Sequence, residues 1–177
     1  MKNNCIQYSI LSLMFTLALG CSSSPAIKKQ AYAKLNNQKT YEYEFLSVWK
    51  ALEETLRNFK IIKKDPDELN SVEIQKITYG TLETDWIYTQ SRDKYQEYLI
   101  NGSPRKIYLQ SRLKYQIELQ KGLGGVTVTV NPQEEIERLN SDGTSAGYEK
   151  TQAPDSLRAH DLLEKLTTAI LAGPPLP

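Results

Sequence analysis

The sequence predicts an α+β fold, in which one antiparallel sheet of about four to five strands packs in two layers against a long C-terminal helix and one N-terminal helix. Two segments, near residues 46–59 and 162–170, repeat apolar residues at three- and four-residue steps, as amphipathic helices do. The segments between them alternate apolar and polar residues, as half-buried strands do. An apolar sheet face and two apolar helix stripes are buried most simply against each other, which gives two layers.

The first 21 residues resemble the leader of a bacterial lipoprotein. Lys2 precedes an apolar stretch at residues 6–19 that is short for a membrane span. Leu17-Ala18-Leu19-Gly20-Cys21 then resembles the lipobox, where such proteins are acylated on cysteine and cut. We therefore predict a signal peptide at residues 1–20 and lipidation of Cys21, with membrane lipid as a partner. The alternative is an ordinary signal peptide or an uncleaved anchor with an incidental cysteine.

The resemblance to lipoproteins also implies a location and a division of the chain. Ser22 follows Cys21, and in two-membrane bacteria a residue other than Asp there is compatible with delivery to the outer membrane. We expect a lipid-anchored protein of the outer membrane that faces the periplasm. Residues 21–39 are polar and rich in small residues, which predicts a flexible tether. Residues 40–172 then form a single domain, and residues 173–177 form a C-terminal tail.

The first half of the domain begins with a short strand and a helix. Tyr41, Tyr43 and Phe45 alternate with polar residues, and a helix of about 14 residues follows with Trp49 on its apolar stripe. Residues 61–64 predict a second strand and residues 79–89 a third. In the third strand Trp86 shares the expected core face with Leu82, Thr84 and Tyr88.

Residues 91–105 interrupt the strand pattern with mixed charges and an Asn101-Gly102 turn signal, which predicts a loop between strands. The loop carries four large apolar or aromatic residues, Tyr95, Tyr98, Leu99 and Ile100, which we assign as a partner-binding segment. A plain connection, or a loop that covers an open end of the sheet, is the competing interpretation.

The second half of the domain predicts two strands and the final helix. One face of the next predicted strand carries Ile107, Leu109, Leu113, Tyr115, Ile117 and Leu119, and the glycines of residues 122–125 permit a tight reversal. Val126, Val128 and Val130 lie on one face of the next strand, which we expect to bend at Asn131-Pro132. Residues 140–153 predict a loop. Asp155 or Ser156 caps the last helix, which Gly173 ends.

Composition argues against several kinds of chemistry. The chain has 22 Lys and Arg against 21 Asp and Glu, so it offers no excess of positive charge for nucleic acid. Its two cysteines are Cys5 and Cys21 and its one histidine is His160, so the domain lacks the ligands of a zinc cluster or a Cys/His dyad. Glu83 and Asp85 could act as paired carboxylates, but such pairs are common on solvated strands. We predict no catalytic residue, metal or cofactor.

The order of these segments resembles a known family. The runs Val48-Trp49-Lys50-Ala51-Leu52, Gly80 to Ile87, Arg112 to Ile117 and Val126 to Val130 are similar to the helix-grip domains of the BamC/NlpB lipoproteins. The resemblance covers residues 41–171, and it implies an accessory subunit of the outer-membrane β-barrel assembly machinery with no catalytic residues. The chain has room for one such domain rather than two, and it lacks that family's long extended N-terminal segment.

Together these features predict a non-enzymatic envelope lipoprotein that acts as a protein-binding accessory subunit. A binding module for a glycan or a small apolar ligand is the alternative. The 11 tyrosines motivate it, because sugar rings stack on aromatic faces. Several tyrosine rings in one concave patch would favour the ligand, whereas a flat or convex patch would favour a protein.

Overall fold

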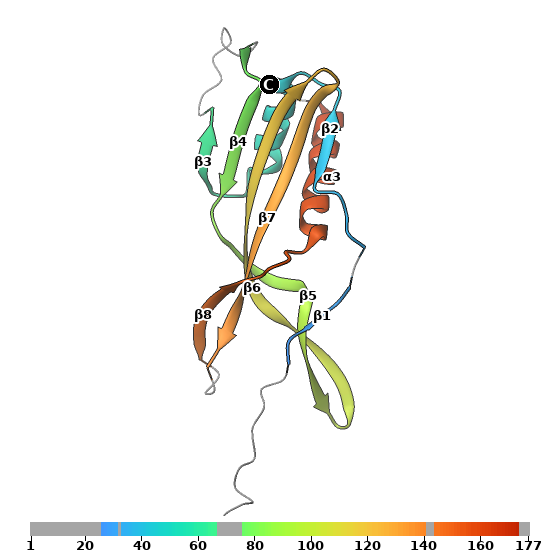
Figure 1. Ribbon diagram of the computed structural model, residues 1–177, viewed down its shortest axis with the longest axis vertical. Coiled ribbons are helices and arrows are strands. Elements are labelled where there is room, and N and C mark those ends of the chain that lie inside the picture. Colours follow the sequence, from blue (N-terminus) through green and yellow to red (C-terminus); the bar gives the residue numbers. More distant parts are fainter. Residues whose placement is uncertain (1–25, 32, 67–75, 141–143, 174–177) are drawn as a thin grey trace, which may run out of the picture.

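The computed structural model describes residues 26–31, 33–66, 76–140 and 144–173, and within them the chain forms an α+β fold with one antiparallel sheet of eight strands and two helices (Figure 1). The elements in chain order are β1 (Lys28–Lys29), β2 (Gln38–Tyr41), α2 (Phe45–Thr55), β3 (Ile61–Asp65), β4 (Tyr79–Thr84), β5 (Ile87–Ile100), β6 (Ser103–Gly122), β7 (Gly125–Leu139), β8 (Ser145–Lys150) and α3 (Ser156–Ala172). The α+β class and the packing of a C-terminal helix on the sheet are confirmed.

Two long strands, β6 and β7, form the spine of the sheet, and each has two shorter neighbours along its outer edge. β4 and β5 pair with successive parts of β6, while β2 and β8 pair with successive parts of β7. β3 lies outside β4, and β1 lies outside β5. The prediction of about four to five strands is therefore wrong for the whole sheet. The count is higher because two strands pair one after the other with each of β6 and β7.

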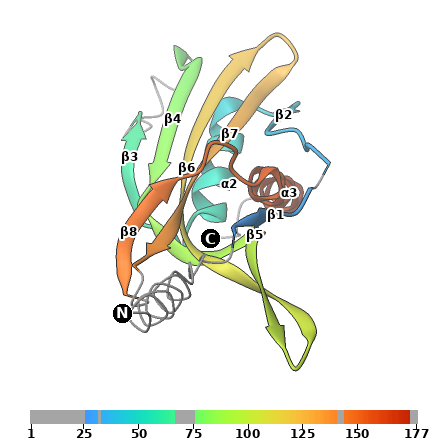
Figure 2. The same cartoon turned by 60° about the horizontal axis from the view of Figure 1, so that its bottom comes forward.

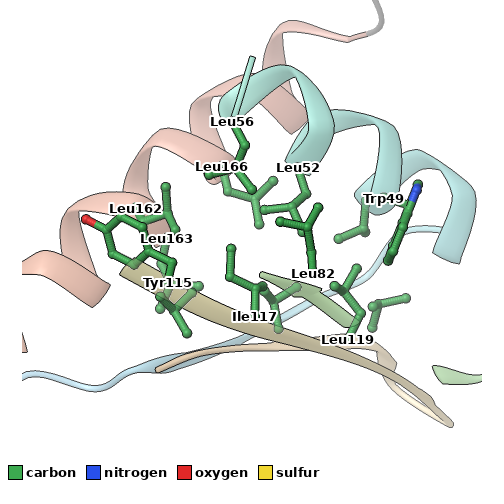
Figure 3. Close-up of a cluster of buried hydrophobic side chains, with 14 of the residues drawn as sticks. Trp49, Leu52, Leu56, Leu82, Tyr115, Ile117, Leu119, Leu162, Leu163 and Leu166 are labelled. Atoms are coloured by element: carbon green, nitrogen blue, oxygen red, sulfur yellow. The ribbon is translucent and has the colours of Figure 1, made fainter. Parts of the chain in front are cut away.

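Both helices cover the same face of the sheet, and the apolar core lies between them and the strands (Figures 1 and 3). The alternation predicted for β6 and β7 places Leu113, Tyr115, Ile117 and Leu119 and then Val126, Val128 and Val130 in this core. The helices contribute Phe45, Val48, Trp49 and Leu52 from α2 and Ala159, Leu162, Leu163 and Leu166 from α3. Asp155 caps α3, because its carboxylate accepts a hydrogen bond from the Leu157 backbone N–H at 2.9 Å.

The predicted strand at residues 79–89 contains a bulge that changes which side chains face the core. The register with β6 shifts by one residue between the pair Glu83–Gln116 and the pair Ile87–Leu113. Because side chains alternate along a strand, one extra residue moves every later side chain to the other face. Ile87 packs against the core, whereas Trp86 is half-buried and Tyr88 is 70% exposed. The prediction of Trp86 as a core residue is therefore wrong.

Neither residue of the predicted bend at Asn131-Pro132 interrupts the pairing of β7, which keeps its register with β6 through both. Pro132 pairs with Tyr115, whose backbone N–H donates to the Thr84 hydroxyl rather than to β7. In such a pair the two backbone nitrogens point away from each other, so the nitrogen of Pro132 points to the far side of β7. There it lies in the gap between β2 and β8, so its missing N–H costs no hydrogen bond of the sheet.

Three segments predicted without strands contain them. Part of the predicted tether at residues 21–39 forms β1 and the start of β2, and part of the predicted loop at residues 140–153 forms β8. The predicted loop at residues 91–105 is strand on both sides of its turn. Most of these residues lie at edges or beyond the core, where both faces of a strand meet water. The buried residues of the third segment are the polar Ser91, Asp93 and Lys94, so none of the three segments carries an apolar alternation that reveals a strand.

Candidate functional site

The ends of β5 and β6 form a two-stranded hairpin that projects from the body of the molecule (Figures 1 and 2). We call residues 95–108 the arm. Its ladder runs from the pair Tyr95–Tyr108 to the pair Ile100–Ser103. Asn101 and Gly102 form the turn with φ angles of 51° and 78°, as the Asn-Gly signal predicts for a two-residue hairpin. The arm extends away from the sheet and does not fold back over its end.

The four predicted partner-binding residues all lie in the arm, but alternation divides them between its two faces. The Tyr95 ring packs on Tyr108, with 5.8 Å between ring centroids, and Lys106 lies 4.4 Å from its centroid. The Tyr98 hydroxyl donates to the side-chain oxygen of Gln96 at 2.6 Å. Leu99 is 75% exposed and Ile100 is 55% exposed at the tip. Of the four predicted residues, only Leu99 and Ile100 present apolar side chains that are mainly open to solvent.

A bulge in β5 fixes the base of the arm to the body through buried charges. Between the pairs Gln90–Gln110 and Tyr95–Tyr108 the β5 chain is longer than the β6 chain, and Ser91, Asp93 and Lys94 are buried there. The Lys94 ammonium donates to Asp93 at 2.9 Å and to Glu134 of β7 at 2.7 Å. Burial lowers the pKa of Lys94, but these two carboxylates together outweigh it and raise the pKa above its ordinary value.

The same bulge is tied to the start of α3. Arg92 pairs with Asp161, and the Arg158 guanidinium donates to the Gln90 carbonyl at 2.7 Å. Beside these contacts lies an open, mainly polar depression of about 400 Å³, lined by Thr89, Gln90, Ser91, Arg92, Tyr108 and Arg158. We interpret this region as the connection that holds the arm to the body.

The sheet face opposite the helices carries a second group of aromatic and charged side chains. The Arg112 guanidinium lies 4.6 Å from the Trp86 ring centroid and 4.7 Å from the Tyr148 ring centroid. Tyr88 meets Tyr148 edge to face, with 6.0 Å between centroids, and Lys114 lies 5.3 Å from the Trp86 centroid. Arg112 also pairs with Glu135 at 2.6 Å. We call Trp86, Tyr88, Arg112, Lys114, Glu135 and Tyr148 the Arg112 cluster.

The sequence did not reveal the Arg112 cluster, because its members come from four strands and from the break between β4 and β5. Tyr88, Arg112 and Glu135 are direct neighbours across β5, β6 and β7. Their alignment depends on the one-residue bulge between β4 and β5 and on β8, a strand in a segment whose sequence predicts a loop. The alternation of Arg112 and Lys114 with apolar residues was the available signal, and it identified only the solvent face of β6.

The carboxylates considered for hydrolysis are separated by the same bulge. Glu83 pairs with Lys114, which lowers the pKa of Glu83. Asp85 lies in the break after β4 and pairs with Lys60 at 2.7 Å, which lowers the pKa of Asp85. Low pKa values keep both groups ionised at neutral pH, whereas glycoside cleavage needs a protonated general acid. His160 is half-buried on α3. Among the described residues, no group of His, Cys, Asp and Glu is arranged to hold a metal ion.

No family model matches the chain, and no curated protein matches it.

Cys21 lies outside the described residues, so its lipidation stays a prediction from the sequence. No helix in the described part of the chain is long and apolar enough to cross a membrane.

Proposed function

We propose that the protein is a non-enzymatic lipoprotein of the bacterial envelope, anchored in the outer membrane through Cys21, that acts by binding another envelope protein. The leader sequence supports the anchor. The observation that carries the binding role is the Arg112 cluster, which gathers Trp, Tyr and Arg side chains on the sheet face that neither helix covers. These three residue types dominate the binding energy of protein interfaces.

The geometry of the cluster favours a protein over a glycan. Sugars bind by lying on an open aromatic face, but Arg112 lies against both the Trp86 and the Tyr148 rings and Lys114 also lies against Trp86. Tyr88, Arg112 and Glu135 form one row of the sheet, and no member of the cluster lines the depression beside the base of the arm. A partner surface with apolar side chains and hydrogen-bonding groups complements this mixture of ring edges and ion pairs.

The family relationship belongs to the same proposal. The antiparallel sheet, with α2 before its main strands and α3 packed on it after the last one, supports a two-layer, helix-grip-like domain related to the BamC/NlpB lipoproteins. The arm and β8 go beyond the strands that this resemblance implies. If the relationship holds, the partner belongs to the outer-membrane protein assembly machinery.

Site-specific photocrosslinking in intact envelopes tests the binding role. Tyr88 is the most exposed aromatic of the cluster, so a photoreactive residue there should yield one discrete crosslinked product. The product should disappear when Arg112→Ala is added, because the cation that holds both rings is lost. A photoreactive residue at Lys165, an exposed position of α3, is the matched control. Absence of a product at Tyr88, or the same product at Lys165, would contradict docking on this face.

A further inference from the structure

The arm concentrates exposed apolar side chains at one end of the molecule. Ile27, Tyr98, Leu99, Ile100 and Ile107 are 60%, 38%, 75%, 55% and 52% exposed. All of them lie in the arm or in the segment beside it, because β1 pairs with β5 at the base of the arm. Isolated exposed apolar residues need no explanation, but a group along a projecting hairpin marks an interaction site.

The N-terminal segment approaches the body along this arm. Lys28 pairs with Tyr95 in antiparallel register. Ala26 and Lys28 line a depression of about 250 Å³ together with Glu97, Tyr98, Leu99 and Pro104 of the arm. The first described residues therefore lie against the outer half of the arm.

The length of chain before β1 matches the length of the arm. Cys21 precedes Lys28 by seven residues, and Gly102 follows Tyr95 by seven. An extended chain spans at most about 3.3–3.6 Å per residue, so both segments reach about 25 Å at most. Acyl chains on Cys21 can therefore lie level with the turn of the arm.

The arm also carries the residue types found at membrane surfaces. Behind the apolar tip lie the rings of Tyr95, Tyr98 and Tyr108, and tyrosine is enriched at the level of lipid headgroups. The charges of the arm and of Lys28 beside it are three cations, Lys28, Arg105 and Lys106, against Glu97 alone. A positive excess next to an apolar tip suits anionic headgroups.

We propose that the tip of the arm, Leu99 and Ile100, inserts into the membrane surface next to the acylated Cys21, with Arg105 and Lys106 against anionic headgroups. This inference rests on the proposed anchor and adds a second contact to it. The arm then sets the orientation of the domain, since one flexible attachment leaves the body free to rotate whereas two adjacent contacts do not. The partner-binding assignment of residues 95–100 is thereby changed from a protein to a lipid surface.

Spin-label accessibility in vesicles tests the insertion. Ile100→Cys and Leu123→Cys are each labelled with a nitroxide in the acylated full chain, reconstituted in phosphatidylethanolamine–phosphatidylglycerol vesicles. Leu123 is the matched control, since it is a fully exposed leucine in the turn between β6 and β7, at the other end of the molecule (Figure 1). We expect the label at 100 to collide several-fold less with a water-soluble nickel chelate than the label at 123, and more with oxygen.

Two outcomes would overturn the inference. Equal nickel collision rates at both positions would place the tip in water. Low collision rates with both reagents at 100 would show that the tip is buried against protein, a second copy being the only protein in these vesicles. The intact mass of the protein distinguishes a failure of the proposed Cys21 anchor from a failure of the proposed insertion of the arm. A free Cys21 contradicts the anchor and the inference together, whereas an acylated chain with an aqueous tip contradicts the inference alone.

A charge variant provides a second measurement. Arg105→Glu with Lys106→Glu should raise the nickel collision rate of the label at 100, because the reversed charges repel anionic headgroups. Lys63→Glu with Lys165→Glu changes the same number of charges away from the arm, and it should leave that rate unchanged. The same rise in both variants would show an effect of net charge and contradict a specific contact of the arm.

Discussion

Gly125 is a position where the backbone itself requires the residue. Its φ is +117°, and a Cβ atom there would lie 2.1 Å from the Tyr41 carbonyl oxygen, which is far inside van der Waals contact. We expect Gly125→Ala to lower the free energy of unfolding by at least about 2 kcal/mol in urea denaturation. Gly124→Ala is the matched control, because nothing lies within 4 Å of the added methyl group and its change should stay within about 0.5 kcal/mol. Similar losses of unfolding free energy in both variants would contradict the close approach of the Tyr41 carbonyl to Gly125.

Three buried titratable residues predict loss of stability at alkaline pH. Burial raises the pKa of Tyr115 and of Tyr41, and the carboxylates around Lys94 raise its pKa despite burial. A group whose pKa is higher in the folded than in the unfolded state stabilises the fold fully below its unfolded pKa, about 10 for Tyr and Lys, and ceases to do so as the pH rises through the folded value.

The melting temperature should therefore fall as the pH rises above about 10. Tyr115→Phe removes one of the three groups and should make this fall less steep. A melting temperature that stays level through this range, or the same slope in the variant, would contradict the assignment.

Among the helices and strands, those that border the core were predicted best. Helix α2 and strands β6 and β7 follow from periodicity, because one face of each is buried and the other is not. The Asp155 cap of α3 follows instead from its residue type. The sequence predicted α2 to continue to residue 59, but the helix ends at Thr55. Strands β1 and β8 and the outer parts of β5 and β6 have no buried face, so only strand pairing defines them. Pairing joins residues far apart in the chain, which a local pattern does not contain.

The two tryptophans distinguish the core from the open face of the sheet. Trp49 is 1% exposed and stacks on Phe45 of the same helix, with Gly80 of β4 directly against its ring. Trp49→Ala should cost about 3–5 kcal/mol of unfolding free energy, since it leaves a large cavity beneath α2. Trp86 is half-buried among cations, so Trp86→Ala should cost less than about 1 kcal/mol and should weaken the crosslink from Tyr88. If Trp49→Ala and Trp86→Ala lowered the unfolding free energy equally in chemical denaturation, the placement of Trp86 outside the core would be contradicted.

At the scale of the whole molecule, the arm and the Arg112 cluster are two separate surfaces of the described chain. The arm lies at one end, and β1 pairs with β5 at the base of the arm (Figure 1). The Arg112 cluster lies on the side of the sheet away from both helices. A domain held at the membrane by its arm would therefore present the cluster sideways to a neighbouring protein. The sequence predicted the residues of the arm but not their hairpin, and it missed the cluster, because both depend on the registers of long strands.

The intact mass of the protein purified from outer membranes tests the central claim most directly, because every proposed role depends on the anchor. We predict a chain that begins at Cys21 and carries the added mass of a diacylglycerol and an amide-linked acyl chain. Cys21→Ala should leave the leader uncut. A mature chain that begins at another residue, or one with an unmodified Cys21 thiol, would contradict the account.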